Sequence, residues 1–133
     1  MRQSQLWQLL EKLDKKDLRD ARKWVASPMH NLRADVLALY DHLSNAHARP
    51  AHLAHKEQAF AACYPDEAYD EARINHLMSW LLECLRDYLG WREWQSDQPA
   101  VRLLRCRALR KLGLDDAFER EWAAARNTLE QQP

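Results

Sequence analysis

Residues 70–94 constrain the fold more strongly than any other stretch of this chain. Apolar residues recur there every three or four positions, which places them on one face of a helix. That face comprises Ile74, Leu77, Met78, Leu81, Leu82, Leu85, Tyr88 and Leu89. Beside it lies a second apolar group of Trp80, Cys84, Trp91 and Trp94. A helix that is apolar over so much of its circumference is buried on several sides, so the stretch predicts a long central helix.

The composition favours helix throughout. The 133 residues include only two glycines, and Ala, Leu, Arg, Glu and Gln supply helix formers where a sheet would need Val, Ile and Thr. A chain of this length fits one domain. We expect an all-α fold in which residues 1–133 form a single domain of about seven helices. They should pack as helical hairpins around residues 70–94, and any subdivision should fall at the proline- and histidine-containing loop 47–54.

Cap residues and apolar spacing predict the remaining helices. In the first half, the expected caps are Ser4 and Asn31, Asp14 and Asp17 should give the second helix an acidic first turn, and Ser27-Pro28 should end that helix. In the second half, Asp97 and Pro99 should start a helix that ends at Gly113, and Asp115 should cap the last one. The buried stripes expected for these two helices are Val101, Leu104, Ala108 and Leu112, and Phe118, Trp122, Ala125 and Leu129.

Charge and cysteine content narrow the functional classes. Twenty basic residues balance twenty acidic ones, so the molecule has no net charge that would attract nucleic acid or an anionic membrane. Three widely separated cysteines are typical of reduced thiols in a cytoplasmic protein. The N-terminus lacks a signal-peptide pattern, and no apolar run is long enough to span a membrane.

No residue pattern indicates catalysis, a cofactor or a metal. The histidines His42, His47, His52 and His55 have no zinc-ligand spacing and no accompanying CxxC motif, so solvated side chains are the simpler interpretation. Any of Cys63, Cys84 and Cys106 would be a nucleophile only beside a base, and each also suits a core position. The adjacent carboxylates lie at helix starts, where they favour the helix dipole. We therefore expect a protein that is not an enzyme.

A basic helix is the most distinctive charged element. It spans residues 99–112 and carries Arg102, Arg105, Arg107, Arg110 and Lys111 without an intervening acid. These cations could contact phosphates of a nucleic acid, or they could be neutralised by an antiparallel, acidic last helix. A helix-turn-helix with Arg73, Asn75 and His76 at the start of its second helix is a further alternative, although that helix resembles core more than a recognition helix.

Tryptophan content favours association with another protein chain. Six tryptophans are many for this length, and aromatic residues are enriched at protein interfaces. The expected partner-binding residues are Trp80, Trp91 and Trp94, since the second apolar group on the long helix is the hardest to cover. The sequence thus predicts a non-enzymatic protein-interaction or scaffold module, working with a protein partner or as a homo-oligomer. The alternative is a nucleic-acid-binding helical domain that uses the basic helix.

Two resemblances agree with helix pairs. A first set of residues at characteristic spacing comprises Trp24, Ser27-Pro28, Asn31, Asp35-Val36, Leu39, Lys56, Phe60, Tyr64-Pro65, Tyr69-Asp70, Arg73 and Leu77-Met78-Ser79. In these positions, residues 6–90 resemble the N-terminal part of an uncharacterised bacterial family of all-helical proteins. The last 25 residues are similar to half of a tetratricopeptide repeat, with Leu112-Gly113, Ala117 and Ala124 at its small positions. The first resemblance implies an all-helical fold and no particular activity, and the second implies stacked helix pairs.

Overall fold

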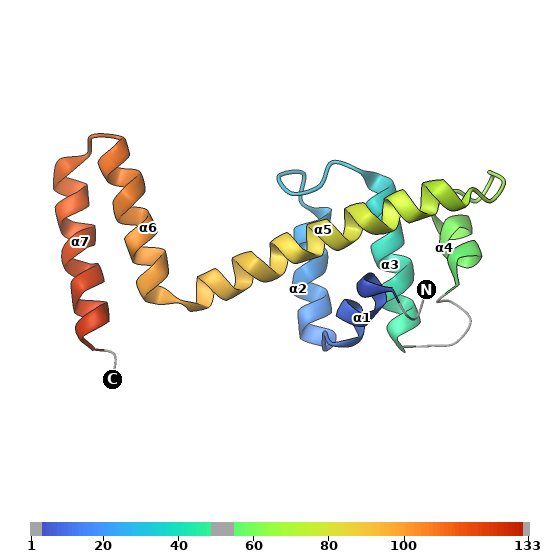
Figure 1. The fold of residues 1–133 in the computed structure, drawn as a ribbon, viewed down its shortest axis with the longest axis horizontal. Helices are drawn as coiled ribbons and strands as arrows, with labels where there is room; N and C mark the ends of the chain where they lie inside the picture. Colours follow the sequence, from blue (N-terminus) through green and yellow to red (C-terminus); the bar gives the residue numbers. More distant parts are fainter. Residues whose placement is uncertain (1–3, 49–54, 132–133) are drawn as a thin grey trace. The chain divides into compact units, whose positions relative to one another are not determined.

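The computed structural model describes residues 4–48 and 55–131, and within these ranges it contains seven α-helices and no strand (Figure 1). The helices are α1 (Gln5–Glu11), α2 (Lys15–Ala26), α3 (Ala34–Ala48), α4 (Lys56–Cys63), α5 (Glu71–Ser96), α6 (Gln98–Lys111) and α7 (Asp115–Glu130). The predicted all-α class, with packed helices and a long helix near residues 70–94, is confirmed. In the part of the chain described here, no helix is both long and apolar enough to cross a membrane.

Internal contacts divide the chain into two compact units, Met1–Tyr88 and Leu89–Pro133. The boundary falls within α5, so that helix contributes to both units. Residues 49–54, at which a subdivision was expected, lie outside the described residues. The expectation of a single domain with a subdivision at that loop stays a prediction.

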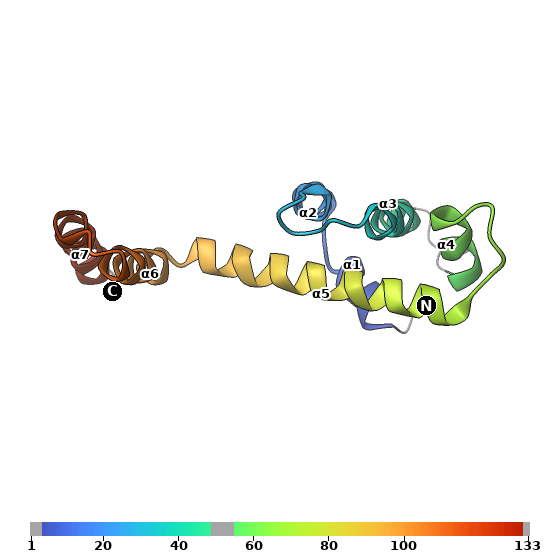
Figure 2. The same cartoon turned by 90° about the horizontal axis from the view of Figure 1, so that it is seen from above.

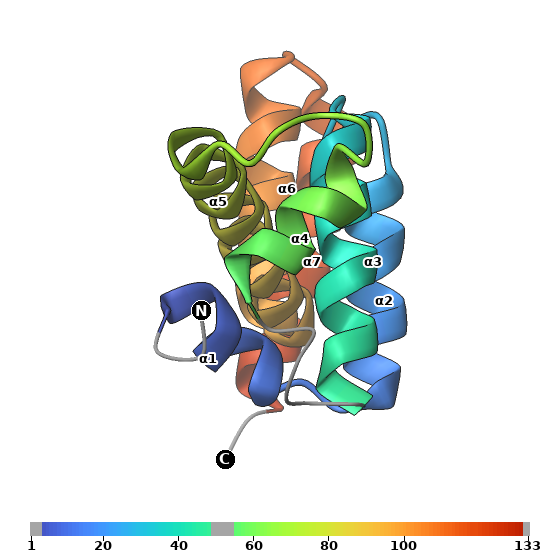
Figure 3. The same ribbon diagram turned by 90° about the vertical axis from the view of Figure 1, so that its right-hand side faces the viewer.

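In the first unit, a layer of three helices covers one side of α5. Figures 2 and 3 show α2, α3 and α4 on the same side of its first part, and in Figure 1 α2 and α3 cross its axis steeply. Helix α3 contacts α1, α2 and α4. The predicted stripe of α5 supplies the centre of this core: Ile74, Leu77, Met78, Leu81, Leu85 and Tyr88 are buried. Side chains of α1 and α3 complete it, among them Leu6, Trp7, Leu10, Leu39, Tyr40 and Leu43.

Most of the predicted helix ends are confirmed. Ser4 accepts a hydrogen bond from the Trp7 amide at 3.1 Å, and Asp97 accepts one from the Ala100 amide at 3.2 Å. Asp17 lies in the first turn of α2 as expected, whereas Asp14 is the cap of that helix and accepts from the Asp17 amide at 2.8 Å. Gly113 follows α6 with a φ of 75°, a conformation that glycine adopts without strain.

Two of the predicted caps are wrong. Helix α3 begins at Ala34, so Asn31 precedes its cap and stabilises the loop before the helix. Asp115 is the first residue of α7, and the cap position belongs to Leu114, which makes no side-chain capping bond. At position 115 the carboxylate can still favour the helix dipole.

The second unit contains a hairpin of α6 and α7, whose contact faces were predicted only in part; in the predicted stripe of α7, only Ala125 is fully buried. Val101 is buried as expected, but Leu104 is 42% exposed and Leu112 is 73% exposed. Ala108, Trp122 and Leu129 are exposed too, and Phe118 is only partly buried. The buried contacts are Cys106 on α6 and Ala125 on α7. When only two helices pack together, each buries a single narrow strip of its surface. Small side chains such as Cys106 and Ala125 suit that strip because they allow the two helix axes to come close together.

Candidate protein-interaction surfaces

The loop between α2 and α3 holds a fixed conformation through its own hydrogen bonds. The Asn31 amide nitrogen donates to the carbonyl of Val25 at 2.9 Å and to that of Arg33 at 3.0 Å. Its side-chain oxygen accepts from the Arg33 amide at 3.0 Å. The carbonyl of Ser27 accepts from the amides of His30 and Asn31 at 3.0 and 2.9 Å. Asn31 thus stabilises a turn in this loop and is not a helix cap.

Aromatic contacts attach this loop to the helices beneath it. The His30 ring stacks on Trp24, with centroids 3.4 Å apart and planes 5° from parallel. Trp24 in turn meets the ring of Tyr88 edge-on at 5.8 Å. At the other end of the loop, the guanidinium of Arg33 lies 4.0 Å above the ring of Trp80, a favourable cation–π distance. The loop is therefore fixed to α2 and to the first-unit part of α5.

The same loop exposes large apolar side chains beside a groove. Met29 is 87% exposed and Leu32 is 86% exposed, and Trp80 is about half exposed. The groove has a volume of about 440 Å³. Its lining comprises Pro28, Met29, His30, Asn31, Leu32, Arg33, Val36, Trp80, Glu83, Cys84 and Asp87. We call these residues the loop surface; all of them belong to the first unit.

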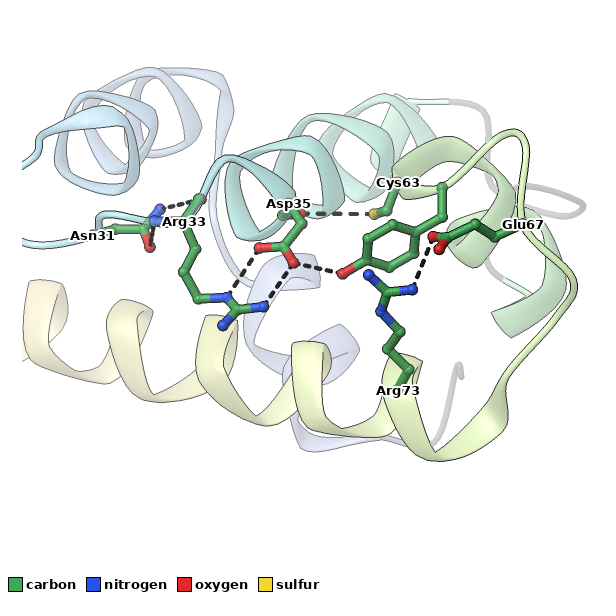
Figure 4. A network of polar contacts seen from close by, with 7 residues as sticks. Asn31, Arg33, Asp35, Cys63, Glu67 and Arg73 are labelled. Carbon is green, nitrogen blue, oxygen red and sulfur yellow. Dashed lines mark hydrogen bonds and ion pairs between the residues drawn. The ribbon is translucent and has the colours of Figure 1, made fainter.

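Asp35 joins the loop surface to α4 (Figure 4). Its carboxylate accepts two hydrogen bonds from the Arg33 guanidinium, at 3.1 and 2.8 Å, and a third from the Tyr64 hydroxyl. The Arg33 bonds are the main cause of a lowered pKa of Asp35. Its backbone carbonyl accepts from the Cys63 thiol at 3.7 Å. This network fixes Arg33, and with it the position of the guanidinium over Trp80.

Arg73 extends the same network to the start of α5. Its guanidinium lies 3.7 Å above the Tyr64 ring and forms an ion pair with Glu67 at 2.8 Å. Arg73 is thus engaged within the chain, while Asn75 and His76, the other residues considered for a recognition helix, are exposed.

Burial raises the pKa of the Cys63 thiol to about 11, so this cysteine is protonated near neutral pH and is a poor nucleophile.

A second surface lies on the hairpin of α6 and α7. A groove of about 410 Å³ is lined by Leu103, Cys106, Arg107, Arg110, Phe118 and Trp122. The rings of Phe118 and Trp122 are nearly parallel, with centroids 6.5 Å apart. Leu103 and Trp122 are both exposed. We call these residues the hairpin groove; it belongs entirely to the second unit.

The five cations of the basic helix divide into two groups. Arg102 and Arg105 each form an ion pair with the Glu121 carboxylate, at 3.6 and 3.8 Å. For these two cations, the last helix neutralises the charge of the basic helix, which was one of the two alternatives considered from the sequence. Arg107 and Arg110 line the hairpin groove, and Lys111 is exposed in the last turn of α6. These last three cations form no ion pair within residues 4–48 and 55–131.

The three tryptophans predicted to bind a partner fall in different units. Trp80 belongs to the loop surface, whereas Trp91 and Trp94 belong to the second unit. Trp91 is exposed, and Trp94 is partly buried with an indole N–H that has no hydrogen-bond partner among the residues that the structure describes. Met29 and Leu32 were missed by sequence reasoning, because helical periodicity says nothing about a loop. Two large apolar residues directly after the Ser27-Pro28 stop were the available signal.

The histidines do not form a metal site in the part of the chain that the structure describes, where no group of three or more His, Cys, Asp or Glu could hold an ion. His42 is partly buried and His55 is exposed. His52 and the side chain of His47 lie outside the described residues.

Comparisons with protein families, with curated proteins and with solved structures find no match for this chain. Its resemblances to a bacterial helical family and to a tetratricopeptide repeat stay predictions. The functional argument therefore depends on the two surfaces themselves.

Proposed function

We propose that this chain is a non-enzymatic scaffold module that associates through its apolar surfaces, and that its loop surface pairs with the loop surface of a second copy. The observation that carries the proposal is the near-complete exposure of Met29 and Leu32 on a loop held by Asn31. A loop whose backbone is already fixed loses little backbone entropy on binding, so the burial of its side chains contributes more fully to affinity.

The loop surface has the features of a self-complementary interface. A two-fold axis presents the same patch twice, so protruding groups of one copy must find matching hollows on the other. Met29 and Leu32 protrude, and the groove beside them offers an apolar hollow with Val36 and Trp80 in its lining. The charges also match, since the loop carries Arg33 and α5 carries Asp87 beside the same groove.

The expected affinity is moderate. Full burial of a methionine or leucine side chain contributes about 1.5–3 kcal/mol, and a symmetric dimer would bury Met29 and Leu32 twice. The loss of translational and rotational freedom opposes association by roughly 4–15 kcal/mol. The four buried side chains contribute about 6–12 kcal/mol in total, which reaches the roughly 8 kcal/mol of a micromolar dimer only at the favourable end of both ranges. Contacts of these side chains with the partner's groove therefore have to contribute to a micromolar dissociation constant.

The absence of catalysis and the cytoplasmic location belong to the same proposal. Arg33, Asp35, Tyr64 and Arg73 are engaged with one another in contacts that position helices. The cysteines Cys63, Cys84 and Cys106 are free thiols, and each has a raised pKa with burial as the main cause. Free, protonated thiols suit a reducing compartment such as the cytoplasm.

The double variant Met29→Asp, Leu32→Asp tests the pairing. We expect it to weaken self-association at least about 100-fold, because each dimer would then place four carboxylates in an apolar contact. At concentrations at which the parent is monomeric, the melting temperatures of the two proteins should match, since both side chains are exposed in the monomer. Sedimentation equilibrium over a concentration series gives the dissociation constants.

Leu112→Asp is the matched control, because Leu112 is another strongly exposed leucine and lies in the second unit. It should associate as the parent does. A double variant that dimerises with the affinity of the parent would show that the loop surface is not the interface.

A further inference from the structure

We propose that the hairpin groove binds an acidic amphipathic segment of a second protein, with apolar side chains of that segment against Leu103, Phe118 and Trp122 and its carboxylates against Arg107 and Arg110. The groove lies in the second unit. Its occupation therefore does not depend on the self-association proposed for the loop surface.

The apolar part of the groove suits large side chains. Phe118 and Trp122 lie one helical turn apart on α7, and their parallel rings form one continuous aromatic wall. Leu103 and Cys106 of α6 line the same groove. Exposed tryptophan, flanked by other apolar groups in a groove, is typical of the anchor positions that dominate binding energy.

The charge of the groove selects acidic partners. Arg107 and Arg110 are three residues apart, which places them on the same side of α6. Within residues 4–48 and 55–131, neither has an ion-pair partner, in contrast to Arg102 and Arg105 on the same helix. A helical segment with carboxylates three or four residues apart presents acidic groups at the same spacing, while its apolar face enters the groove. Arginine also binds carboxylates through two parallel hydrogen bonds.

A protein segment fits this groove better than a nucleic acid does. Asp115, Asp116 and Glu119 occupy the first turn and a half of α7, directly around Phe118 in sequence. Their charge opposes a phosphate backbone that would follow the groove past this end of the hairpin. A peptide needs to place only two carboxylates at Arg107 and Arg110, and can keep the rest of its length apolar or neutral.

Peptide selection on the full chain tests the proposal. The probe is a phage-displayed library of random peptides; a fluorescein-labelled copy of a selected peptide is then titrated by fluorescence anisotropy. We expect selected peptides to be enriched in Asp and Glu alternating with large apolar residues. Arg107→Glu, Arg110→Glu should weaken their binding at least about tenfold, and binding of the parent should weaken as salt is raised. Trp122→Ala should weaken it at least about tenfold as well.

Matched controls separate the groove from general effects of charge and hydrophobicity. Lys15→Glu, Arg120→Glu removes the same charge elsewhere, and Leu114→Ala truncates an exposed apolar residue that does not line the groove. Both controls should bind like the parent. A single-stranded oligonucleotide with the same label tests the nucleic-acid alternative and should not bind at physiological salt.

Three outcomes would overturn the proposal. One is selection of peptides without enrichment in Asp and Glu. Another is binding that survives both the double arginine variant and Trp122→Ala. The third is arginine-dependent binding of the oligonucleotide that excludes the selected peptides. Each is independent of the oligomeric state of the chain, so the failure of this proposal and the failure of the loop-surface dimer are distinguishable.

Discussion

Replacement of Leu81 or Leu85 with aspartate is expected to leave the first unit unfolded at room temperature. Both leucines are completely buried on α5, and no buried charged residue lies beside them that could pair with a carboxylate among the described residues. Loss of the leucine packing alone costs about 2–5 kcal/mol, and burial of an unpaired charge adds to it. Together these terms approach the roughly 5–15 kcal/mol of total stability that a domain of this size has.

Far-UV circular dichroism and urea titration measure this effect. Ser79→Asp, an exposed position on the same helix, is the control and should unfold close to the parent. A Leu81→Asp or Leu85→Asp protein with the melting curve of the parent would mean that this face of α5 is not the centre of the core.

Trp7→Ala is expected to lower the free energy of unfolding by about 3–5 kcal/mol, the usual range for removal of a buried tryptophan. The Trp7 side chain is only 2% exposed, and its indole N–H donates to the Glu11 carboxylate at 2.6 Å. Helix α1 is short, and so short a helix depends on tertiary packing for its stability. Loss of this one side chain should therefore release α1 from the unit.

Trp7→Phe helps to separate packing from hydrogen bonding, since it removes the N–H donor but keeps one aromatic ring and thus most of the apolar contact. Its effect on the free energy of unfolding should be clearly smaller than that of Trp7→Ala, when both are measured by urea denaturation. Equal losses for the two variants would mean that the Glu11 bond, and not the packing, holds α1 in place.

The core of the first unit follows from the sequence because its pattern leaves little choice. On α5 the face that includes Leu77, Leu81 and Leu85 is continuous, and it is the longest apolar face in the sequence of that helix. Caps such as Ser4 and Asp97 were predictable for a related reason, since a side-chain acceptor just before an apolar pattern commonly caps the helix that follows.

The hairpin of α6 and α7 was harder to predict because each helix has more than one apolar strip. Helical periodicity allows a buried strip with Leu104 and Leu112 as readily as one with Cys106. The local sequence does not show which of these neighbouring strips faces the partner helix. The choice depends on the partner helix, where Ala125 permits a close approach and Glu121 accepts Arg102 and Arg105. Such a preference appears only when both helices are considered together.

The loop surface depends on contacts that no local pattern encodes. Exposure of Met29 and Leu32 follows from the hydrogen bonds of Asn31, which the sequence suggested as a helix cap. The position of Arg33 over Trp80 further requires Asp35, which is also bonded to Tyr64 from a distant part of the chain. Sequence reasoning identified Trp80 as exposed aromatic surface, but could not combine it with residues of the loop.

Light scattering coupled to size-exclusion chromatography tests the central claim, self-association through the loop surface, most directly. The purified chain has a mass of 15.7 kDa, and we expect the measured mass to rise towards twice that value as concentration increases through the micromolar range. The Met29→Asp, Leu32→Asp protein should keep the monomer mass throughout. A parent chain that stays a strict monomer at the highest concentrations would contradict the claim.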